Sequence, residues 1–295
     1  MYINAYAYIY EPDKSSVDSK IRKTLFPDFP SSINKRQLRR ASTSSKMAML
    51  AANSIWDLEK TEKPFSIHIG SGLAMIEDTT KFLNALVEYD EEAVSPTQFI
   101  QSTHNTISGQ IALMYQCQNH NFTFSQGAQS YEDAYLDAVL LTNDFPNEEV
   151  LVAGLDEINP LGLKILEDQG FLDQDPNWAS EGAAFFRMSK EKQKNSQLQV
   201  VQHLRGDKME VFQDVKSYMA TLDLKQCLLF GKELLAIDSK ITLDYFDQEI
   251  GVFHTRSAVE KAMGCDILLS QSKQSVLILS SFLNQWSFWH ISKCD

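Results

Sequence analysis

The sequence predicts an α/β protein with layered architecture, because strand-like runs alternate with helical patterns along its 295 residues. The strand-like runs are short, apolar and separated by polar or glycine-containing turns. The helical stretches repeat their apolar residues every three or four positions. Hydrophobic residues make up 43% and charged residues 22% of the chain, which is the composition of an ordinary globular protein with a sizeable core.

The elements follow one another in a regular order. Strand patterns fall at residues 2–9, 65–70, 121–126, 149–154, 183–188, 197–204, 226–230, 275–279 and 286–292. Helical patterns fall at residues 36–57, 75–89, 105–117, 128–142, 208–221 and 254–264. The polar stretch at 189–199 is a natural seam, so we expect an N-terminal half over residues 1–190 and a C-terminal half over residues 196–295.

The charge of the chain restricts its partners. A net charge of −12 argues against nucleic acid and against an anionic membrane surface as ligands. The one basic patch covers residues 35–40, and a solvated helix flank explains it as well as a docking site for an acidic carrier protein. No run of residues reaches the ~18 apolar positions of a membrane span, and residues 1–10 do not read as a signal peptide.

The cysteines indicate a reducing compartment and no metal site. The chain has four, Cys117, Cys227, Cys265 and Cys294, and none has CxxC or Cys–His spacing. Unpatterned free thiols without a signal peptide favour the cytoplasm. We therefore expect neither a metal nor a cofactor.

The segment over residues 121–141, NFTFSQGAQSYEDAYLDAVLL, leads from a strand through Gly127 into a helix. A side chain at such a turn faces the unpaired N–H groups and the positive dipole end of the helix, which lowers the pKa of a thiol. The position that would carry the nucleophile holds Ala128, whose methyl group cannot attack a thioester. The architecture of a nucleophile turn is thus kept without its chemistry.

This segment resembles the nucleophile region of the β-ketoacyl synthases, and five further stretches resemble that family in the correct order. They cover roughly residues 30–190 and are NKRQLRRASTSSKMAMLAANSIW (34–56), FSIHIGSG (65–72), SPTQF with STHNTISGQIA (95–112), VLVAGLDE (150–157) and SEGAAFF (180–186). The resemblance implies a thiolase-like fold: two βαβαβαββ-type halves in αβαβα layers, with the C-terminal half shortened.

The C-terminal third departs from the family pattern at its functional positions. Phe230 stands where the resemblance places the first active-site histidine, and His254 matches the second. Glu249 and Phe253 replace the lysine and glycine that accompany that second histidine. The glycine-rich loop that gates the acyl pocket corresponds to residues 281–286, which contain no glycine. Ala128, Phe230 and His254 are accordingly read as vestigial active-site positions.

Condensation needs a thiolate, imidazoles and oxyanion donors, so these losses predict a protein that does not condense. The resemblance implies a non-catalytic subunit of the chain length factor type, paired as a heterodimer with an active ketosynthase and only indirectly with its acyl carrier protein. Its closest parallels are the cysteine-less proteins of aryl polyene and dialkylresorcinol pigment synthesis. We expect Phe122 and Phe124 to lie at the interface, and the pocket or its gate to involve Gln126, Gln129, His104, Phe253 and Phe282.

Two alternatives remain open from the sequence. Relatives with glutamine at the cysteine position decarboxylate malonyl groups, and Gln126 and Gln129 flank Ala128. A homodimer that binds acyl chains is the other.

Asp156 and Glu157 are adjacent and point apart, so we expect a structural role for them, and Glu181 is expected to fix a loop through backbone N–H groups.

Overall fold

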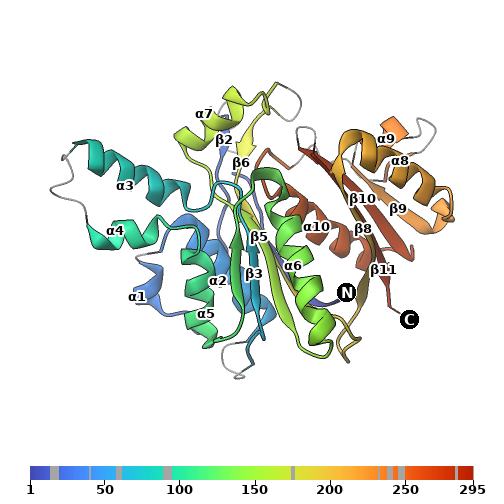
Figure 1. Cartoon of the computed structure of the whole chain (residues 1–295), viewed down its shortest axis with the longest axis horizontal. Coiled ribbons are helices and arrows are strands. Elements are labelled where there is room, and N and C mark those ends of the chain that lie inside the picture. Colours follow the sequence, from blue (N-terminus) through green and yellow to red (C-terminus); the bar gives the residue numbers. More distant parts are fainter. Residues whose placement is uncertain are drawn as a thin grey trace.

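Alternating strands and helices assemble around one nine-stranded mixed sheet with the order β4-β3-β5-β7-β1-β8-β11-β10-β9 (Figure 1). The computed structural model describes residues 1–13, 20–39, 41–57, 62–88, 95–173, 177–231, 233–237, 242–244, 250–282 and 285–294. The strands are β1 (Tyr2–Ile9), β3 (Ile67–Gly70), β4 (Asn121–Phe124), β5 (Val150–Asp156), β7 (Gly182–Ser189), β8 (Leu198–Asp207), β9 (Cys227–Phe230), β10 (Ser275–Phe282) and β11 (Gln285–Lys293).

The helices cover this sheet, and a separate pair of short strands lies beside it. The pair consists of β2 (Ile21–Arg22) and β6 (Ala179–Ser180). None of the helices in the described ranges is both long and apolar enough to span a membrane. The helices are α1 (Lys35–Leu38), α2 (Thr43–Ile55), α3 (Ile76–Glu88), α4 (Pro96–Gln101), α5 (Thr106–Tyr115), α6 (Ser130–Asp144), α7 (Pro160–Asp168), α8 (Lys208–Met219), α9 (Leu234–Ile237) and α10 (Arg256–Ser270).

The predicted strands are confirmed, whereas one predicted helix is wrong. The periodic stretch over residues 36–57 is interrupted, because the Ser42 side chain accepts the N–H of Ser45 and starts α2 afresh after the short α1. The sequence patterns also missed β2, β6, α4, α7 and α9. These elements are between two and nine residues long, too short for periodicity to stand out.

The two parts of the sheet repeat one topology. In the first, β1 leads through α2 to β3, then α6 leads to β5, which pairs in parallel with β3, and β7 returns antiparallel between β5 and β1. In the second, β8, α8, β9, α10, β10 and β11 follow the same plan. β1 and β8 pair antiparallel where the parts meet. Within the described residues, the second part has no counterpart of β4, and this is how the C-terminal half is shortened.

The packing gives five layers of helix and sheet. α2 and α5 cover the outer face of the first part, α8 covers the outer face of the second, and α6 and α10 lie between the two parts (Figure 1). One cluster of buried apolar side chains surrounds the central helices on both sides, and one further cluster lies beneath each outer helix layer. α6 and α10 are therefore buried by sheet on both sides, and the loops at their N-termini meet at one end of the central layer. This is the thiolase-like arrangement that the sequence predicts.

The central layer contains a buried cation. Lys261 on α10 has no solvent exposure, and its Nζ donates a hydrogen bond to the Tyr131 hydroxyl at 2.9 Å. Aromatic rings surround the ammonium, with the centroids of Trp289, Phe186 and Tyr135 at 4.2, 4.5 and 4.7 Å. Burial lowers the pKa of Lys261 to about 7. Cation–π attraction offsets part of the cost of removing the charge from water.

We expect Lys261→Met to be more stable than the wild type at pH 7, with a difference that shrinks toward pH 9. An unfolded lysine titrates near about 10.4, so above pH 7 the unfolded chain binds more protons and the wild type gains stability as pH rises. The slope from this group is at most about 1.4 kcal/mol per pH unit. Urea unfolding at pH 7, 8 and 9 measures the difference in the free energy of unfolding between the two proteins. The contributions of titratable groups that both proteins share cancel in this difference. The exposed Lys216→Met is the control; a pH-independent difference would contradict the role of Lys261.

Candidate functional site

The turn between β4 and α6 forms the floor of the site. Gly127 has φ of 61°, in the left-handed region that glycine adopts without strain. The Ser130 hydroxyl accepts the N–H of Gln126 at 2.9 Å and donates to the Gly127 carbonyl at 2.7 Å, which closes the turn before α6 begins. Ala128 thus lies at the N-terminal end of a fifteen-residue helix, where the helix dipole favours negative charge.

The second wall of the site is the segment that leads into α10. It packs directly on the loop after β3, because a Cβ at Gly72 would lie only 2.1 Å from the Cβ of His254. His254 also faces the turn on the other side: a Cβ at Gly127 would lie 3.5 Å from its Cδ2. Glycine at both positions lets the backbones approach and brings His254 next to the start of α6.

Asp156, at the end of β5, holds these segments together. It is 1% exposed. Its Oδ1 accepts the Ser71 hydroxyl and the Leu73 N–H, each at 2.9 Å. Its Oδ2 accepts the Thr255 N–H at 2.9 Å and the Thr255 hydroxyl at 2.8 Å. Four donors from two loops therefore meet on one carboxylate, which fixes the position of His254 beside Ala128. We call these four hydrogen bonds the Asp156 clamp.

The neighbouring acidic residues have the structural roles that the sequence predicts. Glu157 points away from Asp156 and accepts the N–H of Ser44 at 2.9 Å and of Glu77 at 3.0 Å, near the N-termini of α2 and α3. Burial raises its pKa. Glu181 accepts the N–H groups of two loop residues, Thr24 and Ile158, at 3.1 and 3.2 Å, and the Lys23 ammonium at 2.8 Å.

Ala128 and His254 line one small cavity of about 20 Å³ between α6, α10 and the β10–β11 hairpin. This is the volume of roughly one water molecule. An acyl chain does not fit into it in this conformation. The remaining lining is almost entirely polar: Gln129, Glu132, Arg256, Ser257, Glu260, Ser280, Ser281, Gln285 and Ser287.

The cavity contains a carboxylate network rather than a thiol and imidazole pair. Glu132 is fully buried and accepts the Ser257 hydroxyl at 2.6 Å, and burial raises the pKa of its carboxyl group. Glu260 accepts the Arg256 Nε at 2.6 Å and the Ser280 hydroxyl. Burial lowers the pKa of His254, against the attraction of the Asp156 charge. The imidazole is therefore held in its neutral form near neutral pH.

Of the residues singled out from the sequence, the structure brings Ala128, Gln129 and His254 to this cavity. Others lie elsewhere. Gln126 is exposed, and His104 is exposed in the turn between α4 and α5. Phe230 and Phe253 are each 2% exposed in the central core, where Phe253 stacks on Tyr10 at 6.1 Å. Phe282 ends β10 and pairs with Gln285; its side chain and the position of Glu249 fall outside the described residues.

Several chemically notable side chains could not be anticipated from the sequence patterns. Glu132 and Glu260 follow apolar helical positions, and Lys261 looks like one of many surface lysines. α6 and α10 lie between the two parts of the sheet, so Glu132, Glu260 and Lys261 are buried although the same helices also carry exposed charges such as Asp144. The burial of these charged side chains can be inferred only once α6 and α10 are known to form the central layer.

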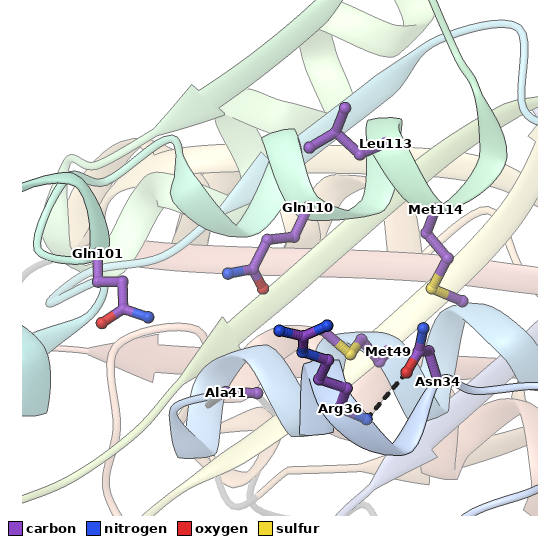
Figure 2. A pocket seen from close by; sticks show the side chains of 8 residues that line it. All are labelled: Asn34, Arg36, Ala41, Met49, Gln101, Gln110, Leu113 and Met114. Atoms are coloured by element: carbon purple, nitrogen blue, oxygen red, sulfur yellow. Dashed lines mark hydrogen bonds between the residues drawn. The ribbon is translucent and has the colours of Figure 1, made fainter. Parts of the chain in front are cut away.

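A larger cavity of about 330 Å³ lies on the outer side of the first part, between α5, α4 and the α1–α2 segment (Figure 2). Gln110 and Met114 reach into it from α5 and Arg36 from α1, and the Arg36 N–H donates to Asn34 Oδ1 at 2.9 Å. Within the described part of the chain, Gln110 Oε1 is buried without a hydrogen-bond partner. The residues that line this larger cavity are Asn34, Arg36, Ala41, Met49, Gln101, Gln110, Leu113 and Met114.

We expect Asp156→Ala to lower the free energy of unfolding by at least about 3 kcal/mol, because four donors would lose their acceptor and two of them are backbone N–H groups. Guanidinium unfolding followed by circular dichroism measures the change. Asp144→Ala, at the exposed end of α6, is the matched control and should change stability by no more than about 0.5 kcal/mol. A loss below about 1 kcal/mol at Asp156 would show that the two loops do not depend on it.

Comparison with known proteins places this fold and site in context. Residues 27–242 match the family described as "Beta-ketoacyl synthase, N-terminal domain". No curated protein sequence matches the chain.

Solved structures of the same fold are numerous. One, titled "AntDE:AntF (apo): type II PKS acyl-carrier protein in complex with its ketosynthase bound to the hexaketide", has a TM-score of 0.75 and 18% identity over 99% of each chain. The ishigamide ketosynthase/chain length factor has a TM-score of 0.71 and 14% identity over 92% of this chain and 87% of that one. The ketosynthase ApeO in complex with its chain length factor ApeC, from Xenorhabdus doucetiae, has a TM-score of 0.59 and 14% identity over 98% of each.

At these identities the structural matches establish the fold alone. The family match is of a different kind, since it rests on the sequence and spans well over half of the chain. The nucleophile turn, the adjacent His254 and the Asp156 clamp all lie on the paired halves of a thiolase-like fold. The chain belongs to the β-ketoacyl synthase N-terminal domain family.

Proposed function

We propose that this protein is a non-catalytic ketosynthase-like subunit of the chain length factor type, which pairs with an active ketosynthase in a polyketide or fatty-acid-like pathway. The observation that carries the proposal is Ala128 at the N-terminus of α6, beside His254 in the same cavity. A methyl group stands where the helix dipole would activate a thiol. The scaffold that positions a nucleophile is kept, and the nucleophile is not.

No other thiol supplies the missing group. All four cysteines are in the described part of the chain, and none lines the cavity around Ala128. Cys265 is fully buried on α10, and burial raises its pKa to about 12, so its thiol is unreactive. Cys117 and Cys227 belong to the outer apolar clusters. Cys294 is near the C-terminus, past β11.

The cavity also favours a role without acyl transfer. Several of its polar side chains bond to one another, and about 20 Å³ of free space leaves no room for an acyl chain beside Ala128. A subunit of this kind would act on a growing chain from across an interface, through the surface that it presents to the catalytic partner.

The edge of the sheet supplies a surface of that kind. β4 is the last strand on its side, so one row of its backbone groups has no neighbouring strand among the described residues. Phe122 on β4 is 50% exposed. Leu113 on α5 and Leu136 and Leu140 on α6 are exposed on the helices that contact β4. An apolar edge of this sort is suited to adding a partner strand.

The assemblies seen in the similar solved structures support this pairing. Two of them are complexes of a ketosynthase with its chain length factor, and a third holds an acyl carrier protein with its ketosynthase. We infer a heterodimer with a catalytic ketosynthase that contains the cysteine, and an acyl chain carried on that partner's carrier protein as the substrate. Aryl polyene or dialkylresorcinol synthesis is the pathway class that the sequence resemblance favours.

A malonyl decarboxylase is the second candidate, because Gln129 lines the same cavity as His254. Glutamine could hold the malonyl thioester carbonyl through its amide while carbon dioxide leaves. This reaction would need no thiol, but it would still need imidazoles, of which Phe230 leaves at most one, and it would need the cavity to open.

We expect the isolated protein to gain no acyl mass when incubated with acyl-carrier thioesters, since Ala128 has no nucleophilic atom. Intact-protein mass spectrometry measures the result. Ala128→Cys is the matched variant and should acquire an acyl group slowly. A stoichiometric, thiol-sensitive adduct on the wild type would overturn the proposal. Loss of carbon dioxide from malonyl-carrier in the same assay, abolished by Gln129→Ala, would favour the decarboxylase instead.

We expect Phe122→Asp to separate the protein from a co-expressed ketosynthase. An obligate interface buries roughly 2,000 Å² or more and is apolar at its centre, and an unpaired carboxylate there costs several kcal/mol. Size-exclusion chromatography of the co-purified pair measures the loss of complex, and Val87→Asp, at an 86% exposed position on α3, is the control. A stable homodimer that ignores every co-expressed ketosynthase would favour the acyl-binding homodimer instead.

A further inference from the structure

Two histidines and one aspartate converge at the end of the central layer away from the Ala128 cavity. Asp137 Oδ2 lies 2.7 Å from His68 Nδ1 and 2.9 Å from His120 Nε2. The rings of His68 and His120 are 5.2 Å apart, and the three ligand atoms all lie within 4.8 Å of one another. Two imidazoles that meet on one carboxylate oxygen give an N₂O donor set without any rearrangement of the backbone.

The register of the strands brings these side chains together. β3 and β4 are parallel neighbours, and His68 lies opposite Phe122. Side chains alternate between the faces of a sheet, so His120, two residues before Phe122, lies on the same face as His68. α6 packs across this face of β3 and presents Asp137 to both rings. Three separate elements therefore each contribute one ligand.

The surroundings suit a metal ligand set. His68 is fully buried, so packing fixes the position of its ring beside Asp137. Its other nitrogen, Nε2, lies 2.8 Å from the Ser66 hydroxyl, and such a bond orients a ligating imidazole and leaves Nδ1 for the ion. The side chains of His120 and Asp137 are 30% and 27% exposed, so the site has access to solvent on one side. That access leaves room for an entering ion and a bound water.

We propose that His68, His120 and Asp137 form a binding site for a divalent zinc-class ion, with water as the fourth ligand. Two imidazoles and one carboxylate are a ligand set that Zn²⁺ accepts in tetrahedral geometry, at distances of about 2.0–2.2 Å. On binding, the ion takes the place of the proton between each ring and Asp137, and each neutral imidazole carries its one N–H on the nitrogen that faces away from the ion, which for His68 is Nε2 beside the Ser66 hydroxyl. The three ligand atoms already lie within 4.8 Å of one another, so binding requires no rearrangement of the strands or of α6.

The ion would join β3, the start of β4 and the middle of α6 into one unit. β4 is the edge strand, and Phe122 on it packs against the His120 ring at 4.2 Å. An ion that binds only the folded state raises its stability by mass action. Because the site lies beside the exposed edge, it would stabilise that edge whether or not a partner covers it. The inference is independent of the proposed pairing with a ketosynthase.

Titration with Co²⁺ tests the site, because tetrahedral Co²⁺ reports its ligands in its visible absorption. The full chain, first dialysed against a chelator, should bind one Co²⁺ per molecule, and Zn²⁺ should displace it and raise the melting temperature. His120→Ala and the near-isosteric Asp137→Asn should each weaken binding by more than about 100-fold, beyond what loss of an outer-shell contact costs. His104→Ala, an exposed histidine outside the cluster, should leave binding unchanged.

Three results would overturn the proposal. One is the absence of saturable 1:1 binding by the folded wild type. Another is unchanged affinity in both His120→Ala and Asp137→Asn, with folding verified by circular dichroism. The third is a sulfur-to-cobalt charge-transfer band in the near ultraviolet, which would assign the ion to a cysteine such as Cys294. His68 is left unchanged in these tests because it is fully buried and its replacement endangers the fold.

Discussion

Four hydrogen bonds to the buried carboxylate of Asp156 hold the site in its present form. The carboxylate lies at the end of β5, between the two parts of the sheet, and collects donors from the loop after β3 and from the turn before α10. A buried charge is tolerated only when its acceptor sites are filled, so the two loops and the carboxylate depend on one another. The places of His254, of the start of α10 and of the small cavity beside Ala128 all follow from this clamp.

The scaffold and the chemistry of a condensing enzyme are separable in this molecule. The scaffold consists of Gly127, the start of α6 and the clamp, and these serve packing and backbone hydrogen bonding as well as catalysis. In the proposed assignment, the chemistry would need a thiol at Ala128 and an imidazole at Phe230, positions that hold apolar side chains. A network of carboxylates and hydroxyls surrounds the cavity and leaves only about 20 Å³ of free space.

Polar groups in the central layer include the Asp156 clamp, the aromatic cage around Lys261, the Glu132 and Glu260 network and the His68–His120–Asp137 cluster. Apolar packing alone would stabilise α6 and α10 between two sheets in many rotational settings. Each of these polar groups finds its partners in only one setting. We therefore interpret them as features that specify the register of the two central helices, at some expense in stability.

The sequence by itself determined the order of the nine strands of the main sheet and of the longer helices, the family resemblance and the absence of a thiol at Ala128. Periodicity and local motifs carry this information, because they act over a few neighbouring residues. The tertiary structure alone decided which distant residues meet. His68 and His120 are 52 positions apart, and Asp137 follows His120 by 17 positions. No local sequence motif therefore predicts that these three residues meet. Lys261 looks like a surface lysine until sheets cover α10 on both faces. Parallel strand register and helix packing set these encounters, and both depend on contacts between segments far apart in the chain.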